Sequence, residues 1–284
     1  MFVCNIEMSS LKSYIFIKGG ETLNKLKKKI EQGEKTCGTI INMCDVCISD
    51  IFSRIGYDFL WVDFEHSYLS YEDILMHTTI AKGNGTPVIV RVPQNDFTAT
   101  KKVLEMGIDG IIFPMVKTAK EVCDLIDFSL YPPNGNRGFG PMAAINYGLD
   151  DANEYIKNAN KDICRFIQIE CKEIIDNLDV IMKNEYIDGY IFGPNDLSGS
   201  INDFLNVYNE KTTKLMEQTI KKLKENHKYV GIATGSNKKE VIEHWHNMGA
   251  DMICSGADFG FLTEGAVNMF NILKEEHIGG KTDE

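Results

Sequence analysis

The chain has 284 residues, of which 43% are hydrophobic and 25% are charged. This composition supplies enough apolar material for a core and excludes disorder over most of the chain. The formal net charge of −11 argues against general nucleic-acid binding, which depends on basic patches.

The N-terminal segment gives no reason to expect export or membrane insertion. It carries Glu7 and Lys12 and lacks a clear cleavage site. No run of the sequence approaches the roughly 20 apolar residues that a membrane span needs. Eight cysteines are too few for a disulfide scaffold in a chain of this length. We therefore expect a cytoplasmic protein that binds neither membranes nor nucleic acid.

Eight short runs of the sequence are typical of strands that are buried on both faces. Each is apolar at most positions rather than strictly alternating, as strands of a parallel sheet are. The predicted strands are Gly38–Met43, Phe59–Asp63, Val88–Val92, Gly110–Pro114, Arg165–Ile169, Gly189–Phe192, Val230–Ala233 and Met252–Ser255.

Longer amphipathic runs precede the first strand and follow each of the eight. The predicted helices are Thr22–Gln32, Asp45–Ile55, Tyr71–Lys82, Asp96–Met106, Thr118–Phe128, Cys171–Asn184, Asn209–Asn226, Asn237–Met248 and Phe259–Lys274. Eight strand–helix units favour an α/β fold of the closed (β/α)₈ TIM barrel type over an open, doubly wound sheet. We expect one barrel domain over residues 22–276, an N-terminal extension at 1–21 and a C-terminal tail at 277–284.

Polar side chains gather where four of the predicted strands end. They are Asp63, Glu65 and His66 after the second strand, Arg91 in the third, Gln168 and Glu170 at the fifth, and Asn195 and Asp196 after the sixth. The carboxyl ends of barrel strands form a common mouth, which is where such enzymes hold their active sites. Alone, each residue has a structural interpretation as a helix cap or a solvated position, but their coincidence favours a site.

These residue types suit one kind of chemistry. The carboxylates of Glu170 and Asp196 are suitable ligands for a hard divalent cation such as Mg²⁺ or Mn²⁺. Arg91 can neutralise a substrate carboxylate or a developing enolate oxygen. Asp63 precedes His66 by three residues, a spacing that allows it to orient the imidazole. Together they indicate proton transfer beside a metal-polarised carbonyl group.

Six motifs in order carry a resemblance to a known family. They are D-F-E-H at 63–66, V-R-V-P-x-N-D at 90–96, F-P-M-V at 113–116, Y-P-P-x-G-x-R-G at 131–138, Q-I-E at 168–170 and G-P-N-D-L-S at 193–198. From about Leu23 to Lys274 the chain resembles the HpcH/HpaI aldolases, a family of metal-dependent pyruvate aldolases. These include the 2-keto-3-deoxy sugar acid aldolases.

The resemblance implies a (β/α)₈ barrel, a role for each site residue and a homo-oligomer. Glu170 and Asp196 match the ligands of a divalent metal (Mg²⁺, Mn²⁺ or Co²⁺), His66 the catalytic base, Asp63 its supporting carboxylate, Arg91 the enolate-stabilising arginine, and Gln168, Gly193, Pro194 and Asn195 the lining of the pyruvate site. Members are usually hexamers whose C-terminal helix packs on a neighbouring subunit. The implied activity is reversible cleavage of a 4-hydroxy-2-oxo acid to pyruvate and an aldehyde.

Several alternatives stay open. A Schiff-base aldolase needs a desolvated lysine, for which Lys117 is the visible candidate. Citrate-lyase-like relatives act on acyl-CoA or oxaloacetate, and a barrel of this kind can also serve as a binding protein without catalysis. Cys44 and Cys47 form a lone C-x-x-C, which suggests a redox or metal role less strongly than two small residues near a helix start.

Overall fold

Eight parallel strands close into a barrel, in a computed structural model that describes residues 24–278. Each strand pairs with the next in the chain, and the eighth pairs with the first. The strands are β1 (Thr36–Ile41), β2 (Phe59–Asp63), β3 (Val88–Arg91), β4 (Gly110–Phe113), β5 (Cys164–Ile169), β6 (Gly189–Phe192), β7 (Val230–Thr234) and β8 (Met252–Ala257). All eight predicted strands are present, so the predicted barrel fold is confirmed.

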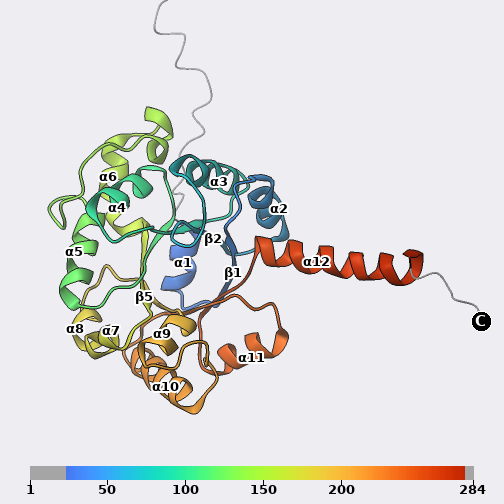
Figure 1. The fold of residues 1–284 in the computed structure, drawn as a ribbon. Helices are drawn as coiled ribbons and strands as arrows, with labels where there is room; N and C mark the ends of the chain where they lie inside the picture. The colour runs from blue at the N-terminus through green and yellow to red at the C-terminus, as the bar shows by residue number, and fades with distance from the viewer. Residues whose placement is uncertain (1–23, 279–284) are drawn as a thin grey trace, which may run out of the picture.

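Helices surround the barrel (Figure 1). They are α1 (Lys25–Glu31), α2 (Cys47–Ile55), α3 (Tyr71–Gly83), α4 (Phe97–Glu105), α5 (Ala119–Ser129), α6 (Ala152–Asp162), α7 (Lys172–Asp176), α8 (Leu178–Ile181), α9 (Pro194–Ser200), α10 (Glu210–Glu225), α11 (Lys239–Asn247) and α12 (Asp258–Leu273). The single helix predicted over Cys171–Asn184 is wrong, because the chain divides it into α7 and α8 at Asn177. Helices α6 and α9 were not predicted.

Successive side chains along each strand point alternately into two apolar cores, and this alternation decides which side chains reach the mouth. In β2, Phe59 and Trp61 belong to a cluster inside the barrel, while Leu60 and Val62 belong to the layer between strands and helices. Continuing the period of two brings Asp63 to the interior at the carboxyl end of the strand.

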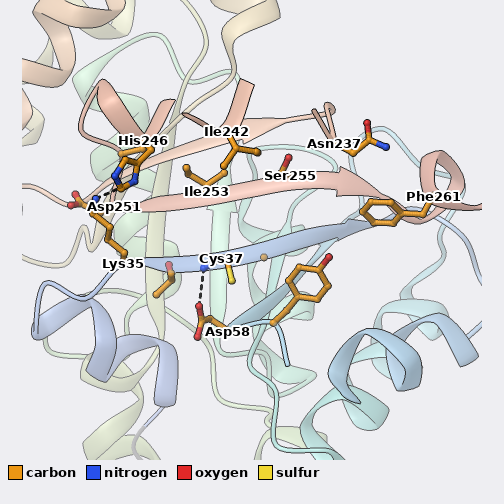
Figure 2. Close-up of a pocket in the computed structure, with 14 residues that line it drawn as sticks. Lys35, Cys37, Asp58, Asn237, Ile242, His246, Asp251, Ile253, Ser255 and Phe261 are labelled. Carbon is orange, nitrogen blue, oxygen red and sulfur yellow. Dashed lines mark hydrogen bonds between the residues drawn. The ribbon is translucent and has the colours of Figure 1, made fainter. Parts of the chain in front are cut away.

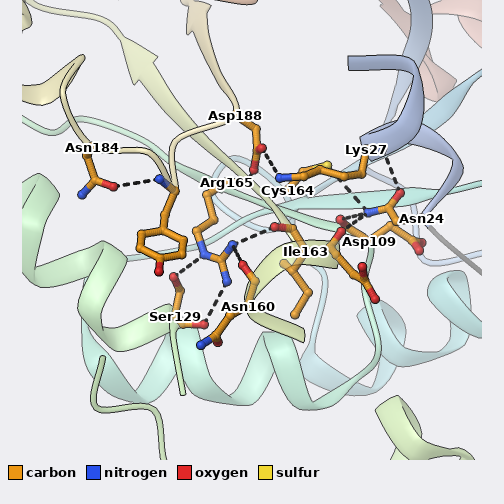
Figure 3. A network of polar contacts seen from close by, with 12 residues as sticks. Asn24, Lys27, Asp109, Ser129, Asn160, Ile163, Cys164, Arg165, Asn184 and Asp188 are labelled. Atoms are coloured by element: carbon orange, nitrogen blue, oxygen red, sulfur yellow. Dashed lines mark hydrogen bonds and ion pairs between the residues drawn. The ribbon is translucent and has the colours of Figure 1, made fainter. Parts of the chain in front are cut away.

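The opposite end of the barrel is closed by α1 and a set of polar contacts (Figure 3). The Asn24 amide donates hydrogen bonds to the carbonyl oxygens of Asp109 (2.6 Å) and Asp162 (2.8 Å), which precede β4 and β5. Lys27 forms an ion pair with Asp188. The fully buried Arg165 donates to Ser129 Oγ at 2.6 Å and to three backbone carbonyls. The polar groups at this end of the barrel thus hold neighbouring segments together. The candidate site lies at the opposite end.

Helix α12 does not pack along the barrel but projects away from it (Figure 1). Helix α11 packs on β8, but within residues 24–278 no helix covers the seam between β8 and β1, and a cavity of about 460 Å³ lies there. Figure 2 shows Cys37, Ile253 and Ser255 at this uncovered face. On α12 itself Phe259, Leu262 and Phe270 are each more than half exposed.

Some predictions concern residues beyond the structure's limits. The N-terminal extension, residues 1–21, and most of the C-terminal tail, residues 277–284, lie outside the described residues. Within residues 24–278, no helix combines the length and the apolarity that crossing a membrane requires.

Candidate active site

The central feature of the mouth is a buried pair formed by Asp63 and Arg91. These residues end β2 and β3 and are direct partners in the strand register. Arg91 Nε donates to Asp63 Oδ1 at 3.0 Å, and Arg91 Nη2 donates to Asp63 Oδ2 at 2.5 Å. This two-point contact fixes the plane of the guanidinium, which also lies over the ring of Trp61, 5.4 Å from its centre.

Two further carboxylates face the other side of the same guanidinium. Arg91 Nη1 lies 3.1 Å from Glu65 Oε2 and 3.9 Å from Glu170 Oε1. Three buried or nearly buried carboxylates therefore share one arginine, and the local charge is negative. An excess of carboxylates that converges in this way suits the binding of a cation.

The predicted contact between Asp63 and the His66 imidazole is wrong. Both oxygens of Asp63 are occupied by Arg91, and Oδ1 also accepts from the backbone N–H groups of Glu65 (3.1 Å) and His66 (3.3 Å). The carboxylate beside the imidazole is that of Glu65, whose Oε2 is 3.7 Å from His66 Nε2. Asp63 thus shapes the turn that carries His66 and holds Arg91, without reaching the ring.

Glu170 is the most deeply buried carboxylate of the mouth, with 2% of the residue exposed. Its Oε2 accepts a hydrogen bond of 2.8 Å from the backbone N–H of Met115, a residue held at a φ of 50°. Burial raises the pKa of Glu170 to about 7, and the charges of Glu65 and Asp196 act in the same direction. A divalent cation would relieve both the burial and the repulsion.

Asp196 approaches this group from α9, the short helix that follows β6. Pro194 occupies the first turn of that helix, where a missing N–H costs nothing, and Asp196 lies in the same turn. The charge of Asp196 is one of the causes that raise the pKa of Glu170, so the two residues predicted as metal ligands lie near each other. Their oxygen donors fit a hard divalent cation, although residues 24–278 contain no cluster of three or more His, Cys, Asp or Glu arranged as a complete metal site.

The predicted lining residues divide into buried and exposed members. Gln168 is buried, and its Oε1 lacks a hydrogen-bond partner within the described part of the chain. Gly193 and Pro194 are buried beside it, whereas Asn195 is exposed. An unpartnered amide oxygen at the mouth is an open hydrogen-bonding position for a ligand.

The chain is similar to known proteins in both sequence and fold. Residues 43–258 match the family described as HpcH/HpaI aldolase/citrate lyase. The chain belongs to the HpcH/HpaI aldolase/citrate lyase family. It is accordingly an enzyme of the aldolase class, a carbon–carbon lyase.

Two curated relatives and one solved structure show how close this likeness is. The hydroxypyruvate/pyruvate aldolase of Roseobacter denitrificans is 29% identical over 240 residues, covering 84% of this chain and 93% of that protein. The 2-keto-3-deoxy-L-rhamnonate aldolase of Escherichia coli K12 is 27% identical over 236 residues, covering 83% and 87%. The crystal structure of an HpcH/HpaI aldolase from Desulfitobacterium hafniense has 26% identity and a TM-score of 0.82, covering 88% and 96%.

Two residues of the aldolase site were not given a role by sequence reasoning. Glu65 continues the inward alternation of β2, and that period was the signal that would have placed it against Arg91. Met115 donates its backbone N–H to Glu170, and a methionine in the sequence does not predict the left-handed backbone conformation that this residue adopts.

Two other candidates fall outside the site chemistry. Lys117 is exposed beside the capping box at the start of α5, whereas a Schiff-base lysine must be desolvated. Cys44 and Cys47 are exposed free thiols at the β1–α2 connection. Among the described residues, no metal-binding cluster includes them.

Gly193 is required by the close approach of the backbone to Glu170. A Cβ atom at this position would lie 2.7 Å from Glu170 Oε1 and 2.8 Å from its Cγ. Because the Met115 N–H anchors Glu170, Gly193→Ala should displace the carboxylate, weaken Mn²⁺ binding at least about tenfold and cost about 1–3 kcal/mol of stability. Calorimetric Mn²⁺ titration and thermal unfolding measure these effects.

Gly83→Ala is the matched control for that substitution, because a Cβ there meets no atom within 4 Å. Mn²⁺ affinity that is equal in Gly193→Ala and in the parent would show that the backbone does not constrain Glu170.

Proposed function

We propose that this aldolase uses a divalent metal to cleave a 4-hydroxy-2-oxo acid to pyruvate and an aldehyde, and that it catalyses the reverse addition. The observation that carries the proposal is the group of convergent carboxylates around the buried Arg91, and the nearness of Asp196 to Glu170 supports these two residues as the ligands of the cation. The relatives named as aldolases of pyruvate and of a 2-keto-3-deoxy sugar acid support this substrate class.

The residues of the chain have separate tasks in such a cleavage. Glu170 and Asp196 would hold Mg²⁺, Mn²⁺ or Co²⁺, and the cation, when bound, would polarise the keto group and stabilise negative charge. His66, which is 63% exposed at the mouth, removes the proton of the substrate 4-hydroxyl group. The C3–C4 bond then breaks, the aldehyde leaves, and the electron pair remains on the pyruvyl fragment as an enolate.

Arg91 and the pocket lining act on that fragment. The guanidinium is held in place by Asp63, so Arg91 faces the enolate oxygen without needing to reorganise during the reaction. Gln168 offers its free amide oxygen, and the backbone at Gly193–Asn195 lies beside the position we assign to the pyruvate carboxylate. Protonation at C3 then releases pyruvate.

Pyruvate enolisation tests this function without knowledge of the aldehyde. Deuterium exchange of the pyruvate methyl protons, followed by NMR, should occur with Mg²⁺, Mn²⁺ or Co²⁺ and stop when a chelator is added. Borohydride in the presence of pyruvate should trap no adduct, since no lysine takes part. Chelator-resistant exchange together with borohydride trapping would instead establish a Schiff-base aldolase.

The protein's partners and location extend the proposal. The partners are a small 2-oxo acid and an aldehyde, with no nucleic acid and no membrane. A cytoplasmic location stays a prediction. The described cysteines are free thiols, which is the state that the reducing cytoplasm maintains.

We also propose that the aldolase is a homo-oligomer in which α12 of one copy covers the β1–β8 face of another, with the hexamer as the expected assembly. Both surfaces are open in the described part of the chain: α12 exposes Phe259, Leu262 and Phe270, and no helix fills the cavity at the seam of β1 and β8. In a barrel of this class the outer face of each strand is covered by a helix. An exchanged copy of α12 supplies that cover.

Light scattering after size-exclusion chromatography tests this assembly. The parent should elute as an oligomer, and the double substitution Leu262→Asp and Phe270→Asp should reduce its mass towards that of one chain, because buried charges are costly at an apolar interface. Val180→Asp, at an exposed apolar position on α8, is the control and should leave the mass unchanged. A parent of monomeric mass would contradict the proposal.

A further inference from the structure

Glu65 lies between two functional groups of the mouth, the positively charged Arg91 and the proposed base His66. One of its oxygens, Oε2, lies 3.1 Å from Arg91 Nη1 and 3.7 Å from His66 Nε2. The side chain is 15% exposed, so its position is set by its surroundings. Glu65 Oε2 makes no hydrogen bond within the described part of the chain, and the contact with Arg91 is therefore an ion pair without a directed N–H bond.

In the part of the chain that the structure describes, no other carboxylate of the mouth contacts both Arg91 and the His66 imidazole. The oxygens of Asp63 are taken by Arg91 and by two backbone N–H groups. Glu170 contacts Arg91 only at 3.9 Å and accepts from the Met115 N–H. Within residues 24–278, Glu65 is the one side chain within ion-pair distance of the His66 imidazole.

The contact between Glu65 and His66 matters because the His66 side chain is largely exposed. An imidazole that is 63% exposed has few packing contacts to fix its ring. Glu65 is itself held through the same oxygen, Oε2, by Arg91, which Asp63 holds in turn. Asp63, Arg91, Glu65 and His66 thus form a continuous series of charged contacts that leads from two barrel strands to an exposed ring.

We infer that Glu65 is the positioning residue of the site: it fixes the His66 imidazole relative to Arg91. The base and the enolate-stabilising group can then act on the same substrate molecule. This inference rests on the proposed function. It predicts that Glu65 affects the proton-transfer step rather than substrate binding. Its removal should lower kcat and leave KM unchanged, because Arg91 and the pocket lining remain.

Cleavage of 4-hydroxy-2-oxopentanoate, detected as pyruvate, provides the kinetic test. In Glu65→Ala, kcat should fall at least about tenfold while KM stays within about twofold, and Glu65→Gln, which keeps an oxygen acceptor, should recover part of the loss. In a His66→Ala background the same Glu65→Ala change should alter kcat by less than about twofold, since a residue that acts through His66 has nothing left to position. Glu72→Gln, an exposed position on α3, is the matched control.

A spectroscopic measurement makes the test independent of turnover. The ring carbon–proton NMR signal of His66 is assigned by its loss in His66→Ala. It should shift and sharpen in Glu65→Ala, while the signal of the remote His246 stays unchanged. An unchanged His66 signal, or an undiminished loss of kcat in the His66→Ala background, would overturn the inference. If the parent shows neither cleavage nor methyl exchange, the proposed function fails, and the NMR result still decides the Glu65–His66 contact.

Discussion

Glu170→Ala should abolish metal-dependent exchange of the pyruvate methyl protons, with a loss of at least about 100-fold. The substitution removes one of the two carboxylates proposed to hold the cation and leaves Asp196 alone. It also removes the acceptor of the Met115 N–H. Mn²⁺ affinity should fall in parallel, which calorimetry measures without any substrate.

Glu170→Gln separates charge from shape in the same experiment. The amide preserves the size of the side chain and can still accept from the Met115 N–H, so the fold should be kept while the charge that attracts the cation is lost. Glu173→Ala, an exposed carboxylate on α7, is the control and should behave as the parent. Parental exchange and parental Mn²⁺ affinity in Glu170→Ala would refute the assignment of this ligand.

Arg91→Met should produce the largest loss of stability at the site together with a loss of catalysis. The pair with Asp63 is buried on both sides, with side-chain exposures of 9% and 4%. Removing the arginine leaves an unpaired buried carboxylate, which costs about 3–5 kcal/mol and lowers Tm by about 10 °C or more. Thermal unfolding measures the stability, and methyl exchange measures the loss of enolate stabilisation.

The double variant Asp63→Asn with Arg91→Met distinguishes a lost ion pair from lost packing. Because it also removes the charge of the carboxylate that loses both of its hydrogen bonds to Arg91, it should be more stable than Arg91→Met alone while remaining inactive. Arg91→Lys should stay charged but lose the two-point contact, and its kcat/KM should fall at least about 100-fold. A double variant no more stable than Arg91→Met would show that the cost comes from packing.

The sequence predicts the strands well because burial on both faces gives them an unambiguous apolar pattern. It predicts where two helices begin for a similarly local reason. Asp96 and Thr118 open two of the predicted helices, and in the structure Asp96 accepts from the Ala99 N–H and Thr118 forms a capping box with Glu121. Helix α9 was missed because its seven residues, which include proline, glycine and two serines, have little helix propensity. Its formation depends on the surrounding structure at the mouth and not on local preference.

The errors at the site arise from contacts that are not local in the chain. Asp63 is near His66 in sequence, yet the strand register places it opposite Arg91, and a bidentate ion pair outcompetes a neighbouring imidazole. The apolar run of Phe259–Lys274 correctly predicts a helix. Its direction away from the barrel is not encoded in that local pattern, because a helix packed on the barrel would have the same apolar run.

The indole ring of Trp61, which lies beneath Arg91, can report on the site by its fluorescence. The chain contains two tryptophans, Trp61 and Trp245, and the guanidinium carbon of Arg91 lies 5.4 Å from the Trp61 ring centre. Indole fluorescence responds to a charge held over its face, so a ligand that neutralises Arg91 changes the emission. A Trp245→Phe chain would therefore carry one native optical reporter at the floor of the mouth, which follows ligand occupancy without labels or coupling enzymes.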